Sequence, residues 1–192
     1  MLRPVQETTQ APALLLHRGS TDAELPALPN KPLLLVDIDG VLSLWGFASD
    51  DRPIGHWHSV EGIPHFLSAT GAGHLHDLAE WFELVWCSGW EERAGEHLPA
   101  LIGAPDLPHL SFDRNPGKAN AHWKLAAVEQ HAGDRPLAWL DDALDERCEA
   151  WAATRNDTAP TLLVRTHPAT GLTAAHVEQL RAWATALRHS GG

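Results

Sequence analysis

Residues 32–42 read Pro-Leu-Leu-Leu-Val-Asp-Ile-Asp-Gly-Val-Leu. The apolar residues from Leu33 to Val36 follow one another without polar alternation, which is typical of a strand buried on both faces of a parallel sheet. The run ends at two acidic residues, Asp37 and Asp39. A carboxylate directly after a buried strand is costly unless it is paired or used, so both aspartates are candidate site residues.

Three further apolar runs, at residues 83–87, 137–140 and 161–164, have the length of short strands. Segments with apolar residues three or four positions apart lie between and after these runs, and this spacing predicts helices. The residues with helical spacing are Leu75, Leu78, Ala79 and Phe82, then Leu125, Val128 and Ala132, then Leu144, Cys148 and Trp151, and finally Val177, Leu180, Ala184 and Leu187. Strands that alternate with helices predict an α/β fold, with a Rossmann-like parallel sheet flanked by helices.

The chain of 192 residues is long enough for one domain with a sizeable core. Residues 1–30 are rich in Pro, Thr and Ala without a sustained period, which predicts a loosely ordered N-terminal extension. The domain itself is expected over residues 31–190. Within it, residues 43–62 contain glycine, proline and three aromatic residues but no helical periodicity, so we expect a short flap or cap there.

The composition argues against several classes of protein. The formal net charge of −11, from 14 basic and 25 acidic residues, argues against extended nucleic-acid binding but leaves room for a local basic pocket. No apolar run approaches the roughly 20 residues that span a bilayer, so we expect neither a signal peptide nor a membrane anchor. The 2 cysteines, Cys87 and Cys148, lie in apolar segments and cannot form a disulfide framework, which favours a cytoplasmic location.

Polar residues follow three of the predicted strands. Asp37 and Asp39 come after the first, Ser88 after the second, and Asp141 and Asp142 after the third. Since ligands bind outside the carboxyl ends of the strands in an open parallel sheet, we expect these side chains to converge. Several crowded carboxylates are costly to ionise without a compensating cation, and oxygen ligands of this kind suit Mg²⁺ best. The sequence therefore predicts a Mg²⁺ site at this edge of the sheet.

These stretches resemble the four motifs of the haloacid dehalogenase (HAD) superfamily. Residues 33–42 are similar to its first motif, an apolar strand followed by Asp-x-Asp-Gly-Thr/Val. Ser88 resembles the second motif, Lys124 the third, and residues 137–142 the fourth motif in its paired-aspartate form. Because all four motifs occur in order, the resemblance is specific. It covers the chain from Lys31 to about Leu187.

A narrower resemblance rests on two segments beside the motifs. Residues 88–94, Ser-Gly-Trp-Glu-Glu-Arg-Ala, and residues 123–125, Trp-Lys-Leu, are similar to a bacterial group of small HAD domains related to those in RNA repair proteins. One departure concerns the longer form of the fourth motif, in which Glu146 stands where Asp is common. The paired-aspartate form does not require an acid at that position.

The resemblance implies a role for each motif residue. Asp37 would be the nucleophile that forms an aspartyl-phosphate, and Asp39 would protonate the leaving oxygen and then activate water. Ser88 and Gly89 would bind the phosphoryl group. Lys124 would bind it too and would offset the negative charge of the transition state.

The same resemblance implies the ligands of the cation. Mg²⁺ would be held by Asp37, by the backbone carbonyl of Asp39, by Asp142, and by Asp141 directly or through water. An aspartate at both acidic positions of the first motif favours phosphoryl transfer over carbon-halogen chemistry, because the dehalogenase branch lacks the second acid in that role.

Two of these assignments have alternatives. Asp141 and Asp142 could instead cap the N-terminus of the following helix, a role that is compatible with metal binding. Lys118 lies six residues before Lys124 and could serve as the phosphate-site lysine, although Lys124 is preferred.

The chain has 9 tryptophans, which is unusual for its length. Trp45 and Trp57 in the flap, and Trp90 beside Ser88, could stack on a planar leaving group or simply pack the flap against the domain. Five others fit strand or helix patterns and are expected to contribute to the core: Trp81, Trp86, Trp139, Trp151 and Trp183.

We therefore expect a Mg²⁺-dependent phosphatase, a phosphoric monoester hydrolase that acts through an aspartyl-phosphate. Its partner would be a phosphorylated substrate, either a small molecule or a polynucleotide end, since a short cap leaves the site open to both. The alternatives are a phosphatase dedicated to nucleic-acid ends and a non-catalytic, phosphate-binding regulatory module. The intact pair of Asp37 and Asp39 argues against the non-catalytic module, and the sequence contains no P-loop, dinucleotide fingerprint or serine-hydrolase elbow.

Overall fold

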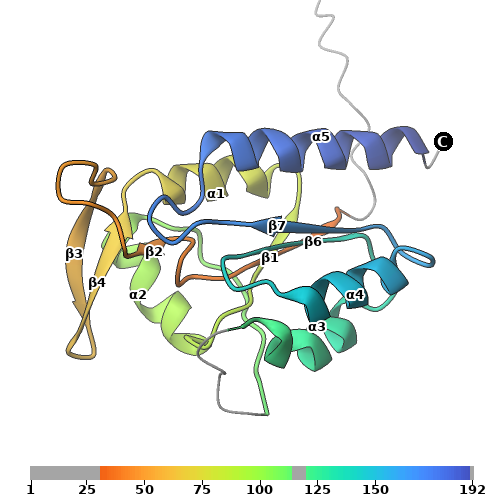
Figure 1. Ribbon diagram of the computed structural model, residues 1–192, viewed down its shortest axis with the longest axis horizontal. Helices are drawn as coiled ribbons and strands as arrows, with labels where there is room; N and C mark the ends of the chain where they lie inside the picture. The colour runs from red at the N-terminus through yellow and green to blue at the C-terminus, as the bar shows by residue number, and fades with distance from the viewer. Residues whose placement is uncertain (1–30, 114–119, 191–192) are drawn as a thin grey trace, which may run out of the picture.

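The computed structural model describes residues 31–113 and 120–190, so the extension expected over residues 1–30 lies outside the described residues. The fold is α/β, as the sequence predicts. Four parallel strands form the main sheet, in the order β5-β1-β6-β7 (Figure 1). Their bounds are β1 (Leu33–Val36), β5 (Glu83–Trp86), β6 (Leu137–Asp141) and β7 (Thr161–Arg165). Each matches a predicted apolar run to within one residue at either end.

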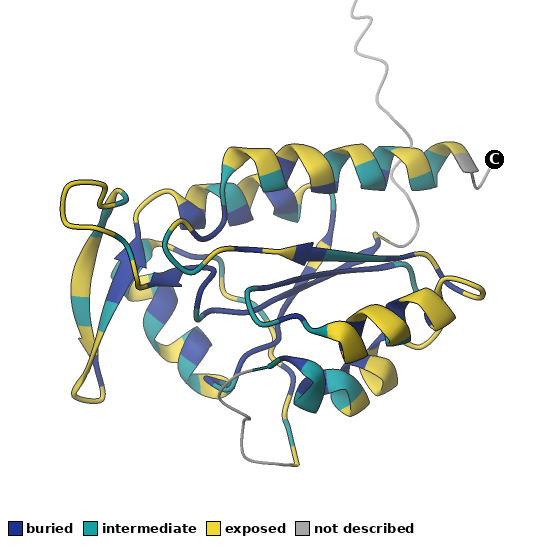
Figure 2. Cartoon of the chain, viewed as in Figure 1, coloured by how far each residue is buried: buried dark blue, intermediate teal, exposed yellow. Residues whose placement is uncertain are grey.

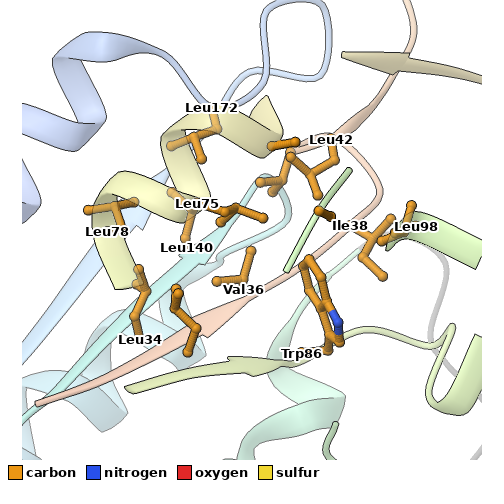
Figure 3. Packing of buried hydrophobic residues seen from close by; sticks show 14 of the residues in the cluster. Leu34, Val36, Ile38, Leu42, Leu75, Leu78, Trp86, Leu98, Leu140 and Leu172 are labelled. Carbon is orange, nitrogen blue, oxygen red and sulfur yellow. The ribbon is translucent and has the colours of Figure 1, made fainter. Parts of the chain in front are cut away.

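Alternate residues of β1 contribute to two hydrophobic cores, one on each face of the sheet. Leu34 and Val36 belong to the larger core, and Leu33 and Leu35 belong to the smaller one. All four side chains are fully buried. Figure 3 shows Leu34 and Val36 in the larger core, with Val36 next to Trp86. Because neither face of the strand meets water, its sequence is a continuous apolar run.

Within the described residues, five α-helices cover the two faces of the sheet. The larger core receives side chains from α1 (Gly71–Ala79), α2 (Glu92–Ile102) and α5 (Ala174–Ser190). The smaller core receives them from α3 (Leu125–Ala132) and α4 (Glu146–Arg155). Figure 1 shows α1 and α5 on one side of the sheet and α3 and α4 on the other. A short 3₁₀ helix, η1 (His122–Lys124), leads directly into α3.

Two helices differ from the sequence prediction. α1 ends at Ala79, so Phe82 is not on its apolar face but lies buried in the turn that leads into β5. The sequence pattern does not predict α2, which buries only Ala94 and Leu98 and contains Pro99 in its interior. A helix with so few buried residues has little apolar periodicity to detect.

The N-cap of α4 is Asp145, whose side chain accepts hydrogen bonds from the backbone N–H groups of Arg147 and Cys148. The alternative in which Asp141 or Asp142 caps this helix is therefore wrong. β6 continues through Asp141, and the loop after it separates both aspartates from the first turn of α4.

The region of the expected flap folds as a small antiparallel sheet in the order β2-β4-β3. Its strands are β2 (Ser43–Leu44), β3 (Gly55–Val60) and β4 (Ile63–Ser68). Glu61 and Gly62 join β3 to β4 with φ angles of 50° and 83°, the conformation of a tight type I′ hairpin. Because β4 pairs along all of β3, the small sheet extends past the expected end at residue 62. Figure 2 shows β3 largely exposed and β4 buried toward its end.

Trp86 and Trp139 are fully buried, as expected, whereas the other three tryptophans assigned to the core are only partly buried against it. Cys87 and Cys148 are both buried and both free thiols. Among the helices of the described segments, none combines the length and the hydropathy that crossing a membrane requires.

Candidate active site

A cleft of about 620 Å³ opens at the carboxyl edge of the main sheet. Its walls come from the segments after β1, β5 and β6, from η1, and from the β3–β4 hairpin. The residues predicted from the sequence that line it are Asp37, Asp39, Ser88, Gly89, Lys124 and Asp142. Asp141 is fully buried and is joined to this group through Lys124. The fold thus brings together side chains that lie far apart in the sequence.

The carboxylate of Asp37 is held from two sides. The residue follows β1, and its backbone N–H extends the sheet by donating to the carbonyl of Leu140. Its Oδ1 accepts a hydrogen bond of 2.8 Å from the backbone N–H of Ile38, and its Oδ2 lies 2.9 Å from Lys124 Nζ. With both oxygens engaged and only 6% of the residue exposed, the carboxylate has a defined orientation at the base of the cleft.

Lys124 bridges two carboxylates. Its Nζ lies 2.9 Å from Asp37 Oδ2 and 2.7 Å from Asp141 Oδ2, and the residue is 3% exposed. Burial alone would lower the pKa of Lys124, but the charges of Asp37 and Asp141 outweigh it and raise the pKa above its ordinary value. The lysine therefore stays protonated. The alternative lysine, Lys118, lies outside the described residues.

Asp37, Asp141 and Asp142 form a compact acidic cluster, with one carboxylate oxygen from each lying within 4.8 Å of the others. Burial and the negative charge of Asp37 raise the pKa of Asp141 to about 7 and that of Asp142 to about 6. Hard oxygen donors that resist ionisation next to one another fit a divalent cation such as Mg²⁺. Across residues 31–113 and 120–190, this is the one cluster of three metal-ligating side chains.

Gly40 provides the space that this cluster needs. Its φ of +70° is a conformation that side chains disfavour, and a Cβ at this position would lie 2.3 Å from Cγ of Asp142. Its carbonyl also accepts a hydrogen bond of 2.8 Å from the buried hydroxyl of Thr166. Any other residue at position 40 would therefore displace Asp142 from the cleft.

Asp39 lies at the mouth of the cleft, outside the acidic cluster. Its side chain is 48% exposed, and its Oδ2 accepts a hydrogen bond of 3.1 Å from the indole N–H of Trp90. Its Oδ1 lies 3.9 Å from Nδ1 of His65. Burial, followed by the charge of Asp37, raises the pKa of Asp39 above its ordinary value. A carboxyl group that holds its proton in this way is suited to donate it.

Ser88 and Gly89 form the turn between β5 and α2. Ser88 is almost fully buried and lines the cleft together with Gly89. Arg93 stabilises the turn, because its guanidinium donates hydrogen bonds to the carbonyls of Gly89 and Trp90 at 2.9 and 3.2 Å. The same guanidinium forms an ion pair of 3.1 Å with Glu61 in the hairpin turn. Arg93 therefore links the small sheet to the loop that carries Ser88.

The three tryptophans considered for stacking have different environments. Trp45 lines the cleft and is 46% exposed. Trp90 also lines the cleft but is buried, with its ring 4.7 Å from that of His65. Trp57 is exposed and packs on Phe66, and it is not among the residues that line the cleft.

Several residues of the cleft are not predicted by the sequence. His65 reaches the cleft only because β4 pairs with β2, so no local pattern indicates it. Trp123 also lines the cleft, and its ring makes an edge-to-face contact with that of Phe112 at a centroid distance of 4.6 Å. Its position next to Lys124 in the narrower resemblance is a signal that could have identified it.

A parallel sheet whose carboxyl edge brings together Asp37 and Asp39, Ser88 and Asp142, with Lys124 beside them, has the architecture of the HAD superfamily, the class to which the chain belongs. Within that class, the chain belongs to the family described as the HAD domain in Swiss Army Knife RNA repair proteins, whose model matches residues 33–177. Comparison with curated proteins found no match, and neither did comparison with solved structures. The family match confirms both the superfamily and the narrower resemblance.

Proposed function

We propose that the protein is a Mg²⁺-dependent phosphatase that hydrolyses phosphoric monoesters through an aspartyl-phosphate on Asp37. One observation carries the proposal: Asp37 lies at the base of an open cleft, paired with a buried lysine and next to two further carboxylates. Membership of a HAD family, which is typical of phosphatase-type hydrolases, supports the same activity.

In the first step, a carboxylate oxygen of Asp37 attacks phosphorus, and the bond between phosphorus and the leaving oxygen breaks. The leaving oxygen takes the electron pair and receives a proton from the carboxylic acid of Asp39. The raised pKa of Asp39 supports this role, because the residue keeps a proton to a higher pH than an ordinary aspartate. The products of the step are the free alcohol or phenol and an acyl phosphate on Asp37.

In the second step, the carboxylate of Asp39 accepts a proton from water as the water oxygen attacks phosphorus. The bond between phosphorus and the Asp37 oxygen breaks, which restores both carboxyl groups and releases inorganic phosphate. The Ser88 hydroxyl would donate to a phosphoryl oxygen, and the Lys124 ammonium would offset the negative charge that builds up in both transition states.

We propose Asp37, Asp142 and the backbone carbonyl of Asp39 as ligands of Mg²⁺. Both oxygens of Asp141 already accept hydrogen bonds, from Lys124 and from the backbone N–H of Ala143, which favours its contribution through water. When bound, Mg²⁺ supplies the positive charge that lets an anionic carboxylate approach an anionic phosphate.

The test is hydrolysis of an aryl phosphate by the full chain, with Mg²⁺ and with chelator, beside Asp37→Asn. We expect turnover only with Mg²⁺, and a loss of about 10³-fold or more in Asp37→Asn, because the amide cannot act as the nucleophile. Asp157→Asn, an exposed aspartate beyond α4, is the matched control and should keep full activity. Residual turnover in Asp37→Asn near the wild-type rate would contradict the mechanism.

A second candidate function is the removal of phosphate from polynucleotide ends. The name of the family favours it, and so does the presence of two aromatic residues, Trp45 and Trp123, and of the guanidinium of Arg93 among the residues that line the cleft. A single end would need few phosphate contacts, which is compatible with a net charge of −11.

This candidate is tested by comparing kcat/KM for a phosphorylated short RNA and for an aryl phosphate over a range of salt. A strong preference for the RNA with a shallow salt dependence would support end processing, whereas equal values would favour small molecules. If neither substrate is turned over but a phosphate mimic binds in a Mg²⁺-dependent manner, the non-catalytic module is the better description.

A further inference from the structure

Asp39 and Trp90 form a contact in which one partner is buried and the other is half-exposed. The indole N–H of Trp90 donates to Asp39 Oδ2 at 3.1 Å. Trp90 is 6% exposed and belongs to the larger core, whereas the Asp39 side chain is 48% exposed. The terminal torsion of an aspartate is broad, so a half-exposed carboxyl group can rotate unless a neighbour holds it.

We propose that Trp90 is a positioning residue for Asp39, which fixes Oδ2 as a hydrogen-bond acceptor and leaves Oδ1 to exchange the catalytic proton. The inference rests on the proposed phosphatase function and adds a residue to it. Trp90 itself is not expected to touch the substrate phosphate or any reacting atom.

The chemistry of the indole group decides which oxygen carries the proton. An indole N–H can donate a hydrogen bond and cannot accept one. In a protonated carboxyl group the carbonyl oxygen is the better acceptor, so Trp90 favours the form in which Oδ2 is the carbonyl and Oδ1 bears the hydrogen. In the first step Oδ1 gives this proton to the leaving oxygen, and in the second step it takes one from water.

Besides Trp90, the ring of His65 and the hydroxyl of Ser43 face the Asp39 carboxyl group. The nearest ring nitrogen, His65 Nδ1, is 3.9 Å from Oδ1, which is beyond hydrogen-bond distance. The same nitrogen is engaged with the hydroxyl of Ser43 at 2.9 Å. Burial lowers the pKa of His65, which favours its neutral form and weakens any pull on the Asp39 carboxylate.

Contacts of both its ring and its backbone hold Trp90 in place. The rings of Trp90 and His65 pack edge to face, with centroids 4.7 Å apart. Its carbonyl accepts hydrogen bonds from both the backbone N–H and the guanidinium of Arg93. The turn before α2 also places Glu91 at a φ of 48°, with its side chain accepting from the backbone N–H of Phe112.

The experiment compares two aryl phosphates whose leaving groups differ in their need for a proton. Phenolate leaves poorly unless it is protonated, whereas 4-nitrophenolate leaves well without help. For Trp90→Phe, which keeps an aromatic ring and removes the N–H, we expect kcat/KM to fall about tenfold for phenyl phosphate and less than about twofold for 4-nitrophenyl phosphate. Asp39→Asn should show the same selectivity with a larger loss. Trp81→Phe, which removes an indole N–H far from the cleft, should change neither value.

A second substitution separates loss of the N–H from any misfolding of Trp90→Phe. Replacement of Trp90 by 3-benzothienylalanine keeps the bicyclic shape and removes only the N–H, and it should give the same selective loss. Equal losses on the two substrates, or no loss on either, would overturn the positioning role while leaving the phosphatase intact. Absence of turnover by the Mg²⁺-loaded wild-type protein would instead overturn the proposed function and, with it, this inference.

Discussion

Among the single residues of the cleft, Lys124 is a buried charge that pairs with two carboxylates. Its ammonium is almost fully buried and lies within 3 Å of carboxylate oxygens from both Asp37 and Asp141. A buried ion pair adds little net stability, because desolvation offsets the attraction between the charges. Loss of one partner is different, since it leaves the opposite charge buried without compensation.

Lys124→Met keeps most of the side-chain volume and removes the charge. We expect it to lower the free energy of unfolding of the metal-free protein by about 3 kcal/mol at neutral pH, since Asp37 and Asp141 lose their counter-charge. The loss should shrink at acidic pH, where protonation neutralises Asp141, whose pKa is raised to about 7 by burial and by the charge of Asp37. Urea unfolding with chelator measures both values. Lys31→Met is the control: its exposed ammonium donates to the carbonyl of Ala79, and a change beyond about 0.5 kcal/mol is not expected.

At the scale of secondary-structure elements, Arg155 joins α4 to the chain segments that enter two strands. It is the last residue of α4 and is 5% exposed. Its guanidinium donates to the hydroxyl of Thr161 at the start of β7, at 2.6 Å. It also donates to the carbonyls of Gly133 and Arg135 before β6, at 2.6 and 2.7 Å. One side chain thus satisfies three acceptors, two in the turn before β6 and one at the start of β7.

Arg155→Met should therefore destabilise the fold without touching the cleft. We expect a loss of about 3 kcal/mol in the free energy of unfolding, because several buried or part-buried acceptors lose a charged donor. Arg165→Met is the matched control, because its exposed pair with Glu149 at 3.2 Å should contribute less than about 1 kcal/mol. Urea midpoints of the two variants, read beside the kcat of the folded fraction, test the assignment. A similar small loss of stability in both variants would refute the structural role of Arg155.

At the scale of the whole molecule, the distribution of charge favours a cation over a long polyanion. The net charge is −11, whereas the cleft is lined by the basic groups of Lys124 and Arg93. The surrounding negative field raises the local concentration of Mg²⁺ and opposes an extended nucleic acid. Both basic groups are already paired, Lys124 with Asp37 and Asp141, and Arg93 with Glu61. Two such groups suit the single phosphoryl group of a monoester or of one chain end better than a long polyanion.

Stability of the whole chain should depend on pH and on Mg²⁺ together. In the folded protein the pKa is about 7 for Asp141 and about 6 for Asp142, above the ordinary value of 3.8. Between about pH 4 and pH 7 the folded state therefore holds protons that the unfolded state has released, so a rise in pH lowers the free energy of unfolding of the metal-free protein. A bound cation removes this penalty, because it stabilises the ionised carboxylates of the folded state.

The measurement is the Tm at about pH 5 and about pH 7.5, with Mg²⁺ and with chelator. We expect Mg²⁺ to raise the Tm more at the higher pH, and Asp142→Asn to reduce both the metal-dependent shift and the loss of stability with rising pH. Asp157→Asn should behave as the wild type. A Mg²⁺ effect of equal size in Asp142→Asn would exclude that residue as a ligand.

Much of the fold could be predicted because the decisive signals are local. The run from Leu33 to Val36 is continuous and apolar because both of its faces are buried, and the acids after it mark the carboxyl edge of the sheet. Strand–helix alternation then predicts a parallel sheet, and a parallel sheet predicts that Asp37, Ser88 and Asp142 meet at one edge. The motifs of the superfamily lie within these local segments, which is why the sequence indicates them.

Contacts between separate elements were decided by the tertiary structure. His65 approaches Asp39 through the pairing of β4 with β2, and the hydrogen bond from Trp90 depends on the pairing of β1 with β5, which brings the segments after the two strands together. α2 itself escapes prediction because it buries too few residues to create a periodic pattern. A sequence pattern records which face of a segment is buried, whereas the distance between two side chains on different segments depends on how those segments pack. For that reason Asp37 could be identified from the sequence as a site residue, with its proposed role as nucleophile implied by the family resemblance, whereas the proposed contact of Trp90 with Asp39 could not be identified.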